Sequence, residues 1–184
     1  MGFQFELKYK ATVIRPMLKN GDPENCEGTT SGVKNIDRWL GDTKWDVIHF
    51  NFGLHDIKQV DPVTKENSNN PKHPQQANLK QYKKTLKQIV EKLKATGAKL
   101  IFATTTPYPD KTSGPLRKPG MSAKYNRAAI KIMNKNDIKI NDLYAFMLPR
   151  MQELQLPNNV HFKSEGSQAL ALKVVDRINE ALDE

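Results

Sequence analysis

Runs of β-strand character alternate with amphipathic helical stripes along this chain, and that alternation restricts the folds it can adopt. The strand-like runs cover 46–52, 99–104 and 138–141, and the first of them reads DVIHFNF. Strands separated by helices favour parallel βαβ units. We therefore predict an α/β fold, a three-layer α/β/α sandwich with a mostly parallel, flavodoxin-like sheet. The valine, isoleucine and phenylalanine content of 46–52 is typical of a strand covered on both faces.

The helical stripes lie between and after these strands. The clearest stripe has apolar residues three and four apart from Leu79 to Leu93, and Gly97 ends it. Ser164 is predicted to cap the last helix. Further helices are predicted at about 33–40, 123–135, 143–154 and 165–182. Polar segments rich in proline are predicted to be loops at 57–78 and 107–122.

The N-terminal region has a different pattern. Residues 3–9 alternate between apolar and polar side chains, which is the period of a half-buried strand. A short β-like run over 11–14 continues it and stops before Pro16. A loop rich in glycine, asparagine and proline follows at 19–31.

Length and composition exclude several classes of protein. The chain has 184 residues, which suits a single domain over 1–184. No apolar run approaches the ~20 residues of a membrane span, and no signal peptide is visible. Cys26 is the single cysteine and the four histidines are dispersed, so we expect no metal site and no cofactor.

The net charge of +9 leaves three interpretations: a nucleic-acid partner, an anionic polysaccharide, or a solvated basic surface. The lysines are scattered, and those between 79 and 96 lie mostly away from the apolar stripe. Aromatic and basic residues are not interleaved as they are in proteins that bind single strands. The pattern favours a solvated surface, and we expect no nucleic-acid partner.

Three segments that follow predicted strands or precede predicted helices carry candidate functional residues. They are Gly28-Thr29-Thr30-Ser31-Gly32, Asn51-Phe52-Gly53-Leu54-His55-Asp56 and Asn158-Asn159-Val160-His161-Phe162. Active sites of parallel sheets lie at the carboxyl ends of the strands, where these loops are expected. Taken singly, each segment has a structural alternative: a helix-start turn for the first, and a structural histidine for the other two.

In this order, the three segments resemble the blocks of SGNH hydrolases, also called GDSL esterases. Gly28–Gly32 resembles the second block, whose glycine N–H helps to form the oxyanion hole. Gly53–Asp56 resembles the third block, Gly-x-Asn-Asp, with His55 at the asparagine position. Asn158–His161 resembles the fifth block, Asp-x-x-His, with His161 at the catalytic histidine. The resemblance extends from about Ala11 to the C-terminus.

The resemblance implies a division of roles that the chemistry of the side chains supports. His161 would be the general base, because an imidazole titrates near neutral pH. Gly28 and His55 would donate hydrogen bonds to an oxyanion, and His55 must then present an N–H. Asn158 would orient His161. Neighbouring polar residues predicted to bind substrate are Asn51, Asp56 and Thr30.

The sequence departs from the family pattern in two places. It contains no Gly-Asp-Ser, the block that carries the nucleophile, so the family's nucleophilic serine is not visible in the sequence, and of its serines only Ser31 lies in a block loop. The family's acid is Asn158 here, and in a related triad an Asp→Asn change costs about 10⁴ in rate. The first strand of the family sheet is expected to be missing or replaced by residues 3–14.

We therefore predict an ester hydrolase acting on small O-acyl, especially acetyl, groups of carbohydrates. The alternative is a non-catalytic binding protein of the same fold or an inactive truncated form. An exposed or swapped N-terminal strand would allow a homodimer. No membrane partner is expected, and the compartment stays open.

Overall fold

The computed structural model describes residues 12–18 and 20–184. Its three strands form one parallel sheet in the order β1-β2-β3. Ile48 lies opposite Leu100, and Phe102 lies opposite Ile140. The strands are β1 (Val47–Phe50), β2 (Lys99–Ala103) and β3 (Lys139–Asn141). The prediction of a parallel α/β sheet is confirmed.

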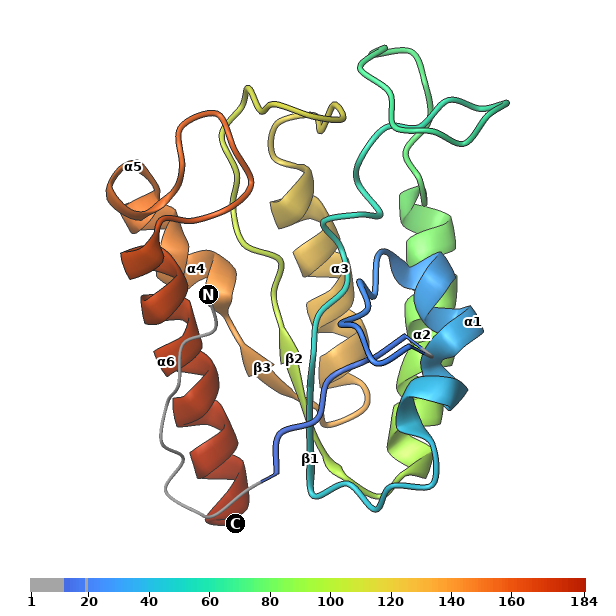
Figure 1. The fold of residues 1–184 in the computed structure, drawn as a ribbon, viewed down its shortest axis with the longest axis vertical. Coiled ribbons are helices and arrows are strands. Elements are labelled where there is room, and N and C mark those ends of the chain that lie inside the picture. Colours follow the sequence, from blue (N-terminus) through green and yellow to red (C-terminus); the bar gives the residue numbers. More distant parts are fainter. Residues whose placement is uncertain (1–11, 19) are drawn as a thin grey trace.

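Helices cover both faces of this sheet (Figure 1). On one side α1 packs on α2 and α2 on α3, while on the other α6 contacts all three strands and is joined by α4 and α5. This is the predicted three-layer arrangement. The helices are α1 (Thr29–Leu40), α2 (Leu79–Ala95), α3 (Met121–Asn134), α4 (Leu143–Met147), the 3-10 turn η1 (Leu148–Arg150), α5 (Met151–Leu154) and α6 (Ser164–Leu182).

The main core lies between the sheet and α2 and α3. Phe50 and Phe102 meet there edge to face with ring centroids 5.4 Å apart, and the apolar stripe of α2 packs onto the same cluster. Leu86 and Ile89 of that stripe are fully buried. The stripe read from the sequence therefore faces the sheet as predicted.

The face toward α6 contains a polar pair. His49 Nε2 lies 3.2 Å from Asn141 Nδ2, and Asn141 also donates to the carbonyl of Lys173 in α6. Because an amide nitrogen only donates, His49 Nε2 accepts this hydrogen bond. Burial lowers the pKa of His49 to about 4, so the ring is neutral near pH 7.

Several predicted boundaries differ from the structure. The helix predicted over 143–154 is divided into α4, η1 and α5, and Pro149 lies in the dividing turn, where it cannot continue the backbone hydrogen bonding. Ser164 does not cap α6: it is the first helical residue, and Lys163 is the N-cap, with no side-chain hydrogen bond. Within the part of the chain that is described, no helix has the length and apolar character of a membrane span.

The N-terminal predictions are tested only in part. The strand predicted at 3–9 and its continuation to residue 11 lie outside the described residues. Thr12 to Ile14 form no strand, and Met17 makes only an isolated antiparallel bridge to Pro23. In the sheet as described β1 lies at the edge, and most of its residues are half-buried rather than covered on both faces.

Candidate active site

The three candidate segments all lie at the end of the sheet where the strands terminate, with 158–162 beside α6 on one side and 28–32 at the start of α1 on the other (Figure 1). One long loop, 104–120 between β2 and α3, connects the two histidine-bearing loops. Its Arg117 Nε donates to the carbonyl of Leu54, beside His55, at 3.0 Å. Its Ser113 N–H donates to the carbonyl of Asn158, near His161, at 2.7 Å. The fold therefore brings the two histidine loops to the same edge and attaches both to one loop.

The N-terminus of α1 is fixed by a carboxylate from the loop after β1. Asp56 Oδ1 accepts the backbone N–H of Thr29 at 2.8 Å and also the Thr29 hydroxyl. Burial raises the pKa of Asp56 to about 6, although the hydrogen bonds from Thr29 oppose this shift. The glycine loop thus becomes helical at Thr29, earlier than the predicted start near residue 33, because a distant side chain caps it.

Gly28 precedes this helix in a tightly packed place. A Cβ at Gly28 would lie 3.0 Å from Gln76 Nε2 and 3.1 Å from Asp56 Oδ1, so the glycine allows the close approach. Its N–H has no acceptor among the described residues. Thr30 lies half-buried in the first turn of α1. Asp56 itself is fully buried, so it supports the helix start from within rather than facing a substrate.

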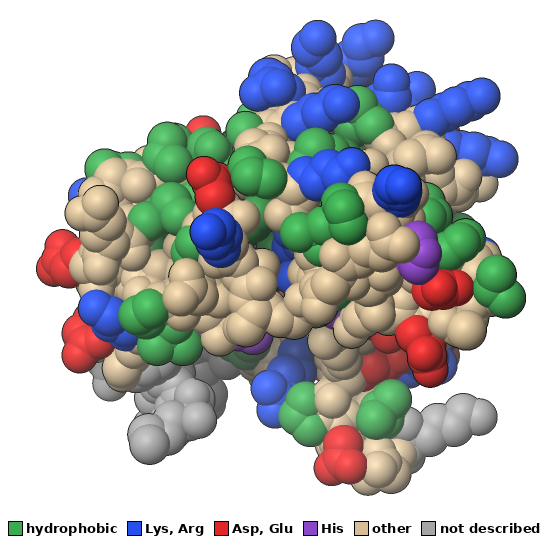
Figure 2. Space-filling view, turned by 90° about the horizontal axis from the view of Figure 1, so that it is seen from above, with side chains coloured by type: hydrophobic (Ala, Val, Ile, Leu, Met, Phe, Trp, Pro, Cys, Tyr) green, Lys and Arg blue, Asp and Glu red, His purple; other side chains and the backbone are tan. Residues whose placement is uncertain are grey.

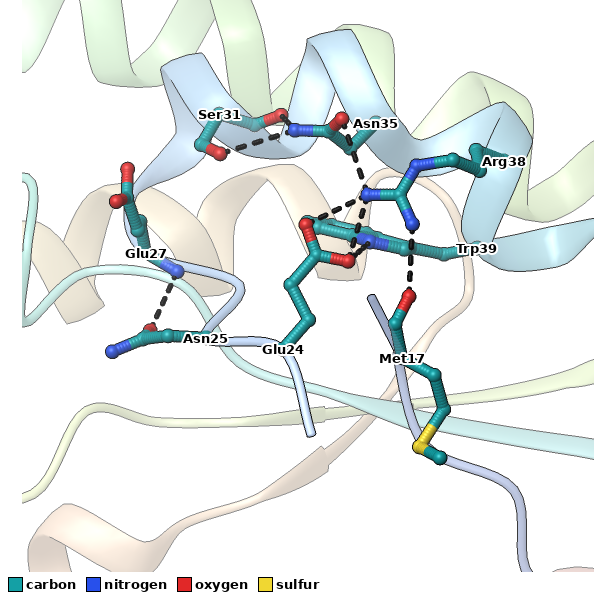
Figure 3. Close-up of polar contacts among 8 residues, drawn as sticks. All are labelled: Met17, Glu24, Asn25, Glu27, Ser31, Asn35, Arg38 and Trp39. Carbon is teal, nitrogen blue, oxygen red and sulfur yellow. Dashed lines mark hydrogen bonds and ion pairs between the residues drawn. The ribbon is translucent and has the colours of Figure 1, made fainter. Parts of the chain in front are cut away.

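A second network holds the segment before Gly28 (Figure 3). Arg38 Nη2 contacts both carboxylate oxygens of Glu24 at 2.7 Å, and Trp39 Nε1 donates to the same carboxylate at 2.8 Å. The hydrogen bond from Arg38 is the main reason why the pKa of Glu24 is lowered. Ser31 lies in the first turn of α1, where its Oγ accepts the Asn35 amide at 3.3 Å.

The turn after β1 depends on a glycine. Gly53 has φ 155°, and a Cβ there would lie 2.3 Å from Thr105 Oγ1. The amide of Asn51 donates to the Ala103 carbonyl at 2.7 Å and lies 3.3 Å from Thr105 Oγ1. Asn51 thus joins the ends of β1 and β2, and this structural role accounts for its position.

His55 follows this turn in a partly buried, positively charged environment. Burial lowers the pKa of His55, and the charges of Lys58 and Arg117 lower it further, while Glu27 raises it. The ring is therefore neutral near pH 7. Its Nδ1 is buried and has no partner among the residues that the structure describes. Arg117 is only 6% exposed, and no local sequence signal pointed to it.

His161 is exposed, and its tautomer follows from one neighbour. Asn159 Oδ1 lies 3.0 Å from the His161 backbone N–H and 2.8 Å from its Nδ1. A backbone N–H only donates, so the atom facing it is the amide oxygen, and Nδ1 must carry a proton to donate to the same oxygen. Nε2 is then the nitrogen that can accept a proton.

The residue that contacts the His161 ring is Asn159 and not Asn158. Asn158 has φ 52°, and its carbonyl accepts the Ser113 N–H and, at 3.2 Å, the Ser113 hydroxyl. It therefore attaches its loop to 104–120 instead of orienting the imidazole. Among the described residues, no serine or threonine hydroxyl is hydrogen-bonded to His161, and no group of three or more His, Cys, Asp or Glu side chains could hold a metal.

The fold and the placement of these loops define a protein of the SGNH-hydrolase class. The model of the family described as "GDSL-like Lipase/Acylhydrolase family" matches residues 9–169. This chain belongs to that family. No curated protein matches it significantly.

Solved structures show the same fold at low sequence identity. A lipase/acylhydrolase from Enterococcus faecalis superposes with a TM-score of 0.63 at 18% identity, over 84% of this chain and 71% of that one. A protein named as an acetyl xylan esterase superposes with a TM-score of 0.65 at 16% sequence identity, over 84% of this chain and 78% of that one. An acetylxylan esterase from Geobacillus stearothermophilus superposes with a TM-score of 0.65 at 19% sequence identity, over 86% of this chain and 70% of that one. At these identities the likeness establishes the fold alone.

Proposed function

We propose that this chain is an SGNH-type esterase that removes O-acetyl groups from carbohydrates. The observation that carries the proposal is the His161–Asn159 contact, which leaves Nε2 of the imidazole to act as the general base. Family membership supports an acyl hydrolase, and two structural neighbours are named as acetyl xylan esterases. The polar segment 57–78 beside the candidate site also suits a sugar better than a lipid chain.

In the proposed reaction, Nε2 of His161 takes the proton of a nucleophilic hydroxyl as its oxygen attacks the ester carbonyl. The carbonyl oxygen becomes an oxyanion, which would accept hydrogen bonds from the N–H of Gly28 and from an N–H of His55. Loss of one such donor typically costs about 3–4 kcal/mol of transition-state stabilisation. The imidazolium then returns the proton to the oxygen of the leaving sugar, which departs as an alcohol and leaves the acetyl group on the nucleophile. A water molecule, deprotonated by Nε2, then attacks the acetyl carbon and releases acetate, while Asn159 keeps the ring oriented throughout.

Two features support these donor roles. The Gly28 N–H has no acceptor among the described residues. The lowered pKa of His55 keeps its ring neutral, and because Nδ1 is buried, the N–H offered to the oxyanion would be that of Nε2. The family's nucleophilic serine is not visible in this sequence, and Ser31, the one serine in a block loop, would have to replace it.

The test is hydrolysis of p-nitrophenyl acetate and of acetylated xylan by the wild-type chain and matched variants. We expect His161→Ala to abolish activity. Asn159→Ala should lower kcat about tenfold, the effect of one lost orienting hydrogen bond, with little change in KM. Asn158→Ala is the matched control and should retain most activity. Wild-type activity no greater than that of His161→Ala would refute the proposal.

A second function, binding without turnover, is favoured by one observation. No hydroxyl among the described residues is hydrogen-bonded to His161, and the serine in the block loop, Ser31, instead accepts a hydrogen bond from Asn35. Calorimetry with acetylated xylo-oligosaccharides distinguishes the two functions: heat of binding with no release of acetate supports the binding protein. Loss of acetate release in Ser31→Ala would instead identify the nucleophile.

A further inference from the structure

A basic groove runs between α2 and α3, on the outer surface of the molecule. The cavity has a volume of about 500 Å³, and its walls come from the two helices. Glu91 is its one acidic lining residue among those described, and six exposed cations line it. These are Lys83, Lys87, Lys124, Arg127, Lys131 and Lys135.

The charges of this groove are not neutralised within the fold. None of the six cations forms an ion pair with a described residue, whereas the nearby Lys92 is paired with Asp37. Figure 2 shows Lys and Arg side chains gathered along one side of the molecule, while acidic side chains lie elsewhere on the visible face. The net charge of +9 is thus partly concentrated here, and such a concentration attracts an anionic partner.

The cations form two rows that suit an extended polymer. Lys83 and Lys87 lie one turn apart on α2. Arg127 and Lys131 lie at the same step on α3, and Lys135, the C-cap of α3, continues the row. Side chains four residues apart lie on one face of a helix, about 6 Å apart along its axis. Both helices run away from the candidate active site, so the two rows are parallel.

The apolar residues of the groove argue against a single-stranded nucleic acid as its ligand. They are aliphatic or small, with Leu79, Val90 and Ile132 among them, and none of the described residues that line the groove is aromatic. Proteins that bind single-stranded nucleic acids stack bases on aromatic rings, which the described lining does not supply. A polysaccharide with one carboxylate on each sugar needs only the regularly spaced cations.

We propose that the groove between α2 and α3 binds an anionic polysaccharide through the carboxylates of its uronic acid units. The site lies outside the candidate active site, and the proposal does not depend on esterase activity. The groove begins at Leu79 and Lys124, next to the loops 51–78 and 104–120. A polymer lying in it would therefore lead toward the edge of the sheet where the acetylated sugar is proposed to react.

The test is calorimetric titration of the wild-type chain with oligogalacturonate at low salt, where the Debye length is about 10 Å or longer. The groove variant is Lys87→Glu with Lys131→Glu. The matched control is Lys34→Glu with Lys44→Glu, two exposed lysines outside the groove, which changes the net charge equally. Circular dichroism confirms that both variants are folded.

We expect the groove variant to bind oligogalacturonate at least about tenfold more weakly, because reversed charges repel the ligand. The control should stay within about twofold of wild type, added salt should weaken binding, and neutral xylo-oligosaccharides should not bind in the groove. Equal losses in both variants, or no binding at low salt, would overturn the proposal. Tighter, groove-dependent binding of single-stranded RNA would replace it with a nucleic-acid site. All of these experiments measure binding and need no turnover, so a failure of the esterase assay would not change their interpretation.

Discussion

Replacing Asp56 with asparagine should reveal how burial of this carboxyl makes the stability of the fold depend on pH. The pKa of Asp56 is raised from 3.8 to about 6, so between these values the folded state holds a proton that the unfolded state has lost. Stability therefore falls as pH rises from about 4 to about 6 and is level above that. The shift corresponds to about 3 kcal/mol.

His49 acts in the opposite direction over nearly the same range. Its pKa is lowered from 6.5 to about 4, so between these values the unfolded state holds the extra proton. Its contribution to stability is present above about pH 6.5 and is lost as pH falls toward 4, again by about 3 kcal/mol. In the wild type, the contributions of Asp56 and His49 largely cancel between pH 4 and 6.

Urea denaturation of the wild type, Asp56→Asn and His49→Gln at several pH values separates the two contributions. As pH rises from 4 to 7, the free energy of unfolding of Asp56→Asn should increase by about 3 kcal/mol relative to that of the wild type. The reason is that the amide still accepts the Thr29 N–H but cannot ionise. His49→Gln should lose a similar amount over the same range. Asp42→Asn, at an exposed position, measures the general effect of removing one negative charge.

Two results would refute this reasoning. If the difference in free energy of unfolding between wild type and Asp56→Asn does not change with pH, Asp56 has the same pKa in the folded and unfolded states. A difference of the opposite sign would mean that the hydrogen bonds from Thr29 outweigh the cost of burial.

Two further predictions concern the turn and the charges beside the candidate site. Gly53→Ala should destabilise the fold by about 3 kcal/mol or more, because the new Cβ has no room, whereas Gly21→Ala, also at positive φ but in open space, should cost only about 1 kcal/mol; equal losses in urea denaturation would contradict this. Lys58→Gln should raise the pKa of His55 and Glu27→Gln should lower it, as measured by NMR titration, since the two charges act on the ring in opposite directions; shifts of the same sign would exclude a direct electrostatic effect.

The sequence predicts those parts of the fold that depend on local pattern. The apolar stripe of α2 repeats over several turns, and a repeat of that length is hard to mistake. The start of α1 could not be found in the same way, because its cap is Asp56, which lies 27 residues from Thr29. Ser164 is a case in which a local signal misleads. Serine is a residue type that suits an N-cap, but α6 already begins at Ser164, so Lys163 occupies the N-cap position.

The candidate site was predictable to the level of its loops and not to the level of each contact. Topology places the ends of parallel strands at one edge, so His55 and His161 could be assigned to the same side of the sheet. Spacing alone does not decide which of the adjacent amides, Asn158 or Asn159, meets the imidazole. Arg117 lies 63 residues from the Leu54 carbonyl that it contacts, and nothing local in the sequence indicates that pairing.

The attachment of both histidine loops to the single loop 104–120 has a mechanical consequence. Arg117 holds one of them and Ser113 the other, so a displacement of this loop moves the proposed base and the proposed oxyanion donor together. Their separation would then be preserved while the whole assembly shifts against the sheet. Hydrogen exchange should accordingly detect the two histidine loops opening as one cooperative unit.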